Sequence, residues 1–171
     1  MEDQQRVIVV IRHAKAEQAG PTDFERELAP RGRQDAAALG SWLAEQGVVA
    51  DHALVSAAAR TQQTWAEVAG AAGWTIEAEI DRGLYAAGPE TALDVLRTAP
   101  DAARTLVVIG HNPTVAYLAQ MLDDGEGDVE ATNQMTIGYP TGAVTLMSYD
   151  GTWAELDEGT ASVTAFHVAR A

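Results

Sequence analysis

Two histidines and two arginines stand where this chain could do chemistry. His13 follows the apolar run VIVVI and His111 follows LVVI, while Arg12 precedes His13 and Arg60 comes shortly after ALVS. In an open α/β sheet, ligands bind in the crevice beyond the carboxyl ends of the strands. We therefore expect these four side chains to meet in one crevice, where the two guanidiniums would grip a phosphoryl group bidentately.

This set of residues predicts phosphoryl transfer through a histidine. A neutral imidazole nitrogen of His13 would attack phosphorus and form a phosphohistidine that water then hydrolyses. The neighbouring guanidiniums disfavour the imidazolium, and a hydrogen bond to the second ring nitrogen would fix the tautomer. The helix expected after Asn112 would add free amides at its positive end. This chemistry requires no metal ion and no other cofactor, because positioning and charge stabilisation carry most of it.

Other polar residues allow two interpretations each. Lys15, the only lysine, either contacts phosphate from the loop after His13 or faces solvent. Asp81 is either a general acid for the leaving group or a solvated loop acid. His52 and His167 have no arginine neighbours, so surface or strand packing is the better explanation for both.

The pattern of apolar residues predicts the elements that hold these side chains. Continuous β-branched runs predict buried parallel strands, and apolar residues three or four apart predict helices. Ser56 is expected to cap the helix that follows it, since it lacks the G-x-S-x-G pattern of a nucleophile. The predicted strands are 6–11, 53–56, 74–79, 105–109, 143–149 and 162–168, the predicted helices are 32–47, 57–72, 89–99 and 113–122, and 123–130 is an acidic loop.

The alternation of strands and helices predicts the fold class. We expect a three-layer α/β/α arrangement in one domain, residues 1–171, with helices on both faces of a mostly parallel sheet. The last two runs are separated by a polar turn at Asp150 and Gly151. They therefore predict an antiparallel edge at the C-terminal end of the sheet.

Charge and composition exclude several classes of function. The net charge of −14 argues against nucleic acid or an anionic membrane surface as a partner, because both favour clustered lysine and arginine. The chain has no cysteine, hence no disulfide and no thiolate nucleophile, and its N-terminus lacks a secretory pattern, so we expect a cytoplasmic protein. The basic residues nevertheless gather in the first 60 positions: Arg6, Arg12, Lys15, Arg26, Arg31, Arg33 and Arg60. That local concentration suits a small anion.

Five segments in order resemble the histidine phosphatase superfamily, also called phosphoglycerate mutase-like, and its SixA-like phosphohistidine phosphatase branch in particular. They are IRHAKAE, FERELAPRGRQDA, LVSAAARTQQTW, GLYAAGPE and LVVIGHNPTV. The resemblance implies that His13 accepts the phosphoryl group and that Arg12, Arg60 and His111 bind its oxygens. Asn112, at the expected helix start, and Lys15, in the loop after His13, are the further candidates for substrate binding from their positions in the sequence.

Departures from the family pattern bear on the substrate. Mutase-type members carry a glycine and an asparagine where this chain has Ala14 and Ala19, and an acid often stands where it has Gly83, which leaves Asp81 and Glu90 as the nearest carboxylates. A weak general acid penalises alkoxide leaving groups more than imidazole. The expected substrate is therefore phosphohistidine on a signalling or phosphotransfer protein. The alternatives are a phosphomonoesterase acting on a small phosphorylated metabolite and a non-catalytic phosphate-binding protein.

Overall fold

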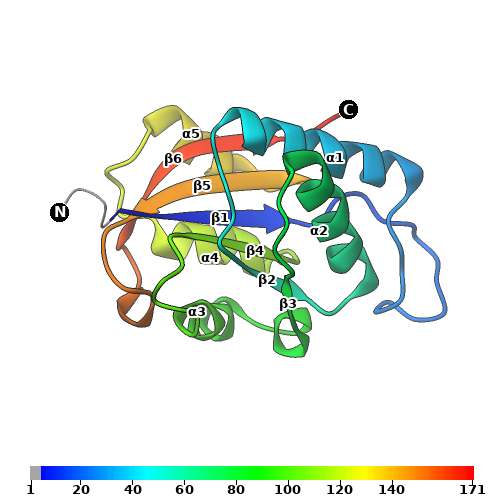
Figure 1. Ribbon diagram of the computed structural model, residues 1–171, viewed down its shortest axis with the longest axis horizontal. Helices are drawn as coiled ribbons and strands as arrows, with labels where there is room; N and C mark the ends of the chain where they lie inside the picture. Colours follow the sequence, from blue (N-terminus) through cyan, green and yellow to red (C-terminus); the bar gives the residue numbers. More distant parts are fainter. Residues whose placement is uncertain (1–4) are drawn as a thin grey trace.

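A computed structural model describes residues 5–171 as a six-stranded mixed sheet covered by helices (Figure 1). The sheet order is β3-β2-β4-β1-β5-β6. The first four strands pair in parallel, and β5 pairs antiparallel with both β1 and β6. This confirms the predicted mostly parallel sheet with an antiparallel C-terminal edge. The strands are β1 (Arg6–Arg12), β2 (His52–Ser56), β3 (Glu79–Asp81), β4 (Thr105–Gly110), β5 (Ala143–Tyr149) and β6 (Ala161–Val168).

The helices form a layer on each face of the sheet (Figure 1). Alternate residues of β1 face opposite layers, so Val9 packs under the first two helices and Ile8 under the others. These helices are α1 (Pro30–Glu45), α2 (Ala59–Ala72), α3 (Pro89–Arg97), α4 (Thr114–Leu122) and α5 (Val129–Ile137), with short 3₁₀ turns at Arg82–Tyr85 and Trp153–Glu155. Within residues 5–171, no helix is long and apolar enough to cross a membrane.

Two predicted elements differ from the structure. The strand expected at 74–79 is wrong, because Trp74 is buried and bonds the Val48 carbonyl through its indole N–H (3.0 Å). Residues 74–78 therefore follow α2 without forming a strand, and pairing with β2 begins only at Glu79, the first residue of β3. The acidic loop expected at 123–130 ends at Asp128, whose carboxylate accepts from the Ala131 N–H and caps α5. Sequence reasoning missed α5 because few of its residues are apolar.

The register of the sheet brings three strand ends together. Arg12 of β1 pairs with Gly110 of β4, and Val55 of β2 pairs with Ile109 of β4. The residues that follow these strands therefore leave the sheet at one edge. His13 and His111 accordingly lie close together, with ring centroids 5.5 Å apart.

Candidate active site

His13 is held by backbone contacts on two sides. Its N–H donates to the Gly110 carbonyl (3.1 Å), which extends the β1–β4 ladder by one residue. Its Nδ1 lies 2.7 Å from the Ala14 carbonyl oxygen, which can only accept a hydrogen bond. Nδ1 therefore carries the proton and Nε2 keeps its lone pair, as a nucleophile requires.

Burial keeps the His13 ring neutral. The residue is 7% exposed, and burial lowers its pKa to about 3. The Ala14 hydrogen bond works in the opposite direction, while His111, Arg60 and Arg12 each lower the pKa further by Coulombic repulsion. Desolvation, rather than the charge of the guanidiniums expected from the sequence, is the larger cause. The ring is unprotonated at neutral pH by either route.

His111 faces His13 from the end of β4. Its Nε2 lies 2.8 Å from the Ser56 hydroxyl, while its buried Nδ1 has no hydrogen-bond partner in the described part of the chain. Burial, followed by repulsion from Arg60, lowers the pKa of His111 to about 4. The expectation that Ser56 caps the next helix is wrong: the residue in the cap position of α2 is Ala58, which makes no side-chain cap bond. The Ser56 hydroxyl instead orients a site histidine.

Arg60 reaches the site from the first turn of α2. The residue is buried, and its guanidinium donates to Asp23 twice, from Nη1 to the backbone carbonyl (2.8 Å) and from Nη2 to a carboxylate oxygen (3.2 Å). The loop that carries Asp23 is tied to α2, because the Ala59 N–H donates to the Phe24 carbonyl (3.0 Å). Among residues 5–171, the buried Nε of Arg60 has no hydrogen-bond partner. Two hydrogen bonds thus fix the guanidinium and leave its Nε–H edge free.

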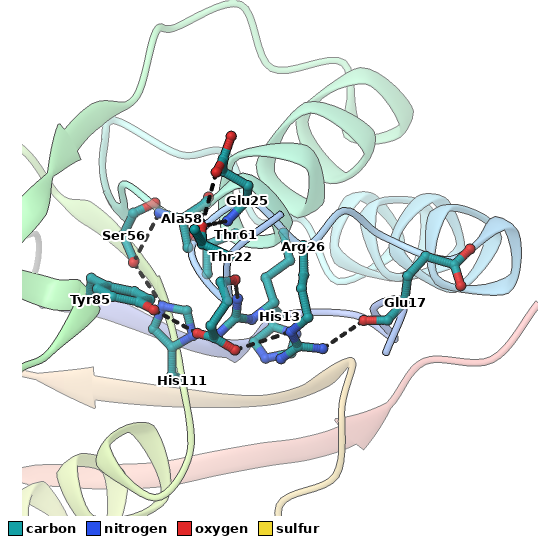
Figure 2. A network of polar contacts seen from close by, with 12 residues as sticks. His13, Glu17, Thr22, Glu25, Arg26, Ser56, Ala58, Thr61, Tyr85 and His111 are labelled. Atoms are coloured by element: carbon teal, nitrogen blue, oxygen red, sulfur yellow. Dashed lines mark hydrogen bonds and ion pairs between the residues drawn. The ribbon is translucent and has the colours of Figure 1, made fainter. Parts of the chain in front are cut away.

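Asp23 is the centre of a network that sequence reasoning missed. Its carboxylate accepts from the Tyr85 hydroxyl (2.6 Å) and from Arg26 Nε (3.0 Å), and the Tyr85 ring lies edge-on to His111 at 5.6 Å. Figure 2 shows Tyr85, Ser56 and His111 converging from three separate segments. The Tyr85 hydrogen bond, with those of Arg26 and Arg60, lowers the pKa of Asp23 to about 2.

Some signals for this network were present in the sequence. Asp23 and Arg26 lie three residues apart in the arginine-rich N-terminal part, and Tyr85 belongs to the GLYAAGPE segment. No periodicity connects these two regions, which are about sixty residues apart. Tertiary contacts join them: the Tyr85–Asp23 hydrogen bond and the edge-to-face contact of Phe24 with Tyr85, whose ring centroids lie 5.0 Å apart.

Arg12 and Asn112 share one anchor. Arg12 Nη1 (3.1 Å) and Asn112 Nδ2 (2.9 Å) both donate to the Tyr139 carbonyl. The Tyr139 hydroxyl, in turn, donates to the Val10 carbonyl within the core. Asn112 and Arg12 are therefore held at the same backbone carbonyl. Helix α4 begins at Thr114, one residue later than expected.

The remaining predicted residues are Lys15 and Asp81. Lys15 lines a hollow with Arg31, Asp35, Thr141 and Arg170. The Asp81 carboxylate accepts from the Leu84 N–H (3.1 Å) and caps the 3₁₀ turn at Arg82–Tyr85. The structure thus brings together His13, His111, Arg12 and Arg60, with Asn112 beside them. Within residues 5–171, neither Lys15 nor Asp81 forms a hydrogen bond with any of these side chains.

The site has unused hydrogen-bonding capacity. Within residues 5–171, four buried side-chain nitrogens lack a hydrogen-bond partner, and three of them are Arg12 Nε, Arg60 Nε and His111 Nδ1. Leaving such groups unpaired costs about 1–3 kcal/mol each, and more for charged ones. Two guanidinium N–H edges beside a neutral nucleophilic imidazole are complementary to a tetrahedral oxyanion. The arrangement can therefore bind a phosphoryl group and transfer it to His13 Nε2.

Comparisons with known proteins agree with this geometry. Residues 8–86 match the model of the histidine phosphatase superfamily (branch 1). The uncharacterized protein Rv1276c of Mycobacterium tuberculosis is 35% identical over 162 residues, which cover 94% of this chain and all of that protein.

Solved structures cover nearly the whole chain. A protein of Nakamurella multipartitia assigned as a phosphohistidine phosphatase SixA superposes with a TM-score of 0.87 at 28% identity, covering 98% of both chains. A protein of Agrobacterium tumefaciens with the same assignment gives a TM-score of 0.77 at 26% identity, covering 95% of this chain and 97% of that one. The chain belongs to the histidine phosphatase superfamily, in its SixA-like branch, and is a hydrolase of the phosphatase type.

Proposed function

We propose that this phosphatase hydrolyses phosphohistidine on a protein through a phosphorylated His13. The observation that carries the proposal is the set of unpartnered nitrogens around a neutral imidazole: Arg12 Nε, Arg60 Nε and His111 Nδ1. Bound phosphoryl oxygens would satisfy all three. Each charge-assisted hydrogen bond contributes about 1.5–3 kcal/mol, and bonds that shorten in the transition state lower the barrier.

In the first step, Nε2 of His13 attacks the phosphorus of the substrate. The N–P bond to the substrate imidazole breaks as the new N–P bond to His13 forms, and the departing imidazole keeps the bonding electron pair. Nδ1–H of His13 remains on the Ala14 carbonyl, which stabilises the positive charge that develops on the ring. Arg12 and Arg60 spread the charge on the equatorial oxygens.

In the second step, water attacks the phosphorylated His13. The oxygen of water bonds to phosphorus, the bond to Nε2 breaks, and inorganic phosphate leaves with the water proton transferred to bulk solvent or phosphate. His13 returns to its neutral form because its pKa of about 3 disfavours the imidazolium. His111, with a pKa of about 4, stays neutral and acts as a donor through its Nδ1 when Ser56 donates to Nε2.

The carboxylates near the site favour a phosphoramidate over an ester. Asp23, on Arg60, is ionised at neutral pH because its pKa is about 2, so it holds no proton for a leaving oxygen. Asp81 caps the turn before Leu84. An alkoxide would depart unprotonated from such a site, whereas an imidazole departs as a much weaker base. The SixA assignment of the two structural relatives supports the same substrate class.

A trapping experiment tests the mechanism. The protein is mixed with a ³²P-labelled phosphohistidine phosphotransfer domain, quenched in alkali and separated by electrophoresis. Wild type and His52→Ala should carry acid-labile label, and His13→Ala should carry none. His52 serves as the matched control because it begins β2, at the opposite end of that strand from Ser56, and contacts Glu79.

Rates with two substrate classes test the specificity. The phosphohistidine domain and p-nitrophenyl phosphate are compared by kcat/KM under the same conditions. The proposal requires faster turnover of the phosphohistidine domain. Equal or faster turnover of the ester would overturn it and favour a small-metabolite phosphomonoesterase, and a label retained on His13→Ala would overturn the mechanism.

A further inference from the structure

A cationic hollow lies beside the loop that follows His13. It has a volume of about 410 Å³ and is lined by Lys15, Arg31, Asp35, Thr141 and Arg170. Three of these five residues are cationic in a chain of net charge −14. Neither His13 nor His111 lines the hollow, and no step of the proposed reaction uses it.

A buried carboxylate holds the two arginines of the hollow in place. Asp35 is 3% exposed and accepts from Arg31 Nε (3.1 Å) and from the Ala171 N–H (2.9 Å), while Arg170 Nη1 lies 3.8 Å from its other oxygen. Arg170 also donates to the Thr141 carbonyl (2.9 Å). Each guanidinium therefore has a fixed inner edge and an outer edge that is free for another anion.

The start of α1 adds to the positive potential of the hollow. The cap position of this helix, Ala29, makes no side-chain cap bond, and the first turn contains no acidic residue. A Cβ on Gly32 would lie 2.0 Å from the Lys15 carbonyl oxygen, so only glycine lets this helix end pack directly against the loop. The partial positive charge of the helix N-terminus thus lies next to Lys15 and Arg31.

The hollow lies within one side chain's reach of the site. Lys15 is two residues from His13, so their Cα atoms are at most about 7 Å apart. The Gly142 N–H, next to Thr141, approaches the carbonyls of Arg12 (3.2 Å) and His13 (3.1 Å). One helical turn advances about 5.4 Å, which is comparable to the separation of Lys15 and His13. If a partner helix presents its phosphohistidine to His13, an acidic residue one or two turns away on that helix can therefore reach the hollow.

We propose that this hollow, formed by Lys15, Arg31 and Arg170, docks an acidic side chain of the phosphoprotein substrate while its phosphohistidine enters the site at His13. The inference rests on the proposed function and adds how the partner is chosen. Exposed charge pairs at an interface rim act mainly on encounter rate and specificity. Each arginine should therefore change affinity by up to about fivefold, with strong dependence on salt.

The test uses a purified phosphotransfer domain with glutamates one turn from its histidine, and a version with those glutamates changed to glutamine. Binding of the unphosphorylated domains is measured by titration calorimetry or anisotropy, because this measurement does not depend on turnover. Arg31→Gln and Arg170→Gln retain donors for Asp35, and Arg31→Lys retains the charge. Turnover of p-nitrophenyl phosphate and of a sugar bisphosphate is measured for the same variants.

The expected result is a three- to fivefold loss of affinity for the acidic domain in each glutamine variant, little loss in Arg31→Lys, and no further loss when the domain lacks its glutamates. Turnover of p-nitrophenyl phosphate should stay unchanged. Lys15→Gln removes the third cation of the hollow at an exposed position and should also lose affinity, so it keeps the test decisive if an arginine variant does not fold.

Three results would overturn the docking surface. They are wild type that does not bind the acidic domain, variants that bind it as tightly as wild type, and a loss confined to the sugar bisphosphate, which would make the hollow a site for a metabolite's second phosphate. Arginine-dependent binding without phosphohistidine hydrolysis would support the surface and refute the proposed function. The two proposals therefore fail separately.

Discussion

Acid should destabilise this protein through its two buried site histidines. His13 has a pKa of about 3 in the folded chain, against about 6.5 when unfolded. The folded state then binds fewer protons, so the stabilisation is fully present above pH 6.5 and is lost as the pH falls towards 3. Between pH 7 and pH 5, this histidine alone should reduce the free energy of unfolding by about 2 kcal/mol. His111, with a pKa of about 4, should add a similar, somewhat smaller amount.

Urea unfolding at pH 7 and pH 5 measures this effect. Wild type and His13→Ala share every other titrating group, so the difference between their pH slopes isolates one histidine. His13→Ala should lose about 2 kcal/mol less than wild type over that interval. Identical slopes for the two proteins would refute the reasoning, since they would mean that the His13 ring titrates normally in the fold. An NMR titration of the His13 ring protons gives an independent value.

Three substitutions probe the supports of the site. Arg60→Lys keeps the charge but loses the bidentate edge, so kcat/KM should fall about 10- to 100-fold, corresponding to one charge-assisted bond. Arg33→Lys, at a half-buried position with ion pairs of 3.6–3.7 Å, should match wild type, and equal rates for both variants would contradict the assigned role. Ser56→Ala removes the hydroxyl 2.8 Å from the second histidine and should lower kcat about 3- to 10-fold in a phosphoramidate assay; an unchanged kcat would speak against that contact. Gly32→Ala places a methyl 2.0 Å from a backbone carbonyl and should cost about 1–3 kcal/mol in urea unfolding, while Gly70→Ala, in open space on α2, should be neutral or stabilising.

The location of the nucleophile could be predicted from the sequence. The β-branched run before Arg12 and His13 predicts a strand followed directly by a nucleophile, because periodicity and residue type are local properties of the chain. The same reasoning placed His111 and Arg60 at neighbouring strand ends. The rule that parallel strands present their carboxyl ends at one edge then required these residues to meet.

The contacts between loops could not be predicted in this way. Ser56 reads locally as a helix cap, yet its hydroxyl bonds His111, because the register of β2 against β4 sets the two strand ends side by side. The sequence around Asp23 gives no sign of a role in the site. Its carboxylate nevertheless orients Arg60 and accepts a hydrogen bond from Tyr85, which lies about sixty residues further along the chain. Such pairings depend on which loops the packed layers bring together.

The sequence by itself determined the strand-ending His13, the alternation of elements and the class of chemistry, because each follows from short-range periodicity and side-chain type. The tertiary structure alone decided that burial rather than charge keeps that imidazole neutral, that Asp23 is ionised on Arg60, and that a cationic hollow forms where α1 meets the loop at Lys15. Burial and charge proximity are properties of the assembled chain. They depend on long-range packing that no local pattern encodes.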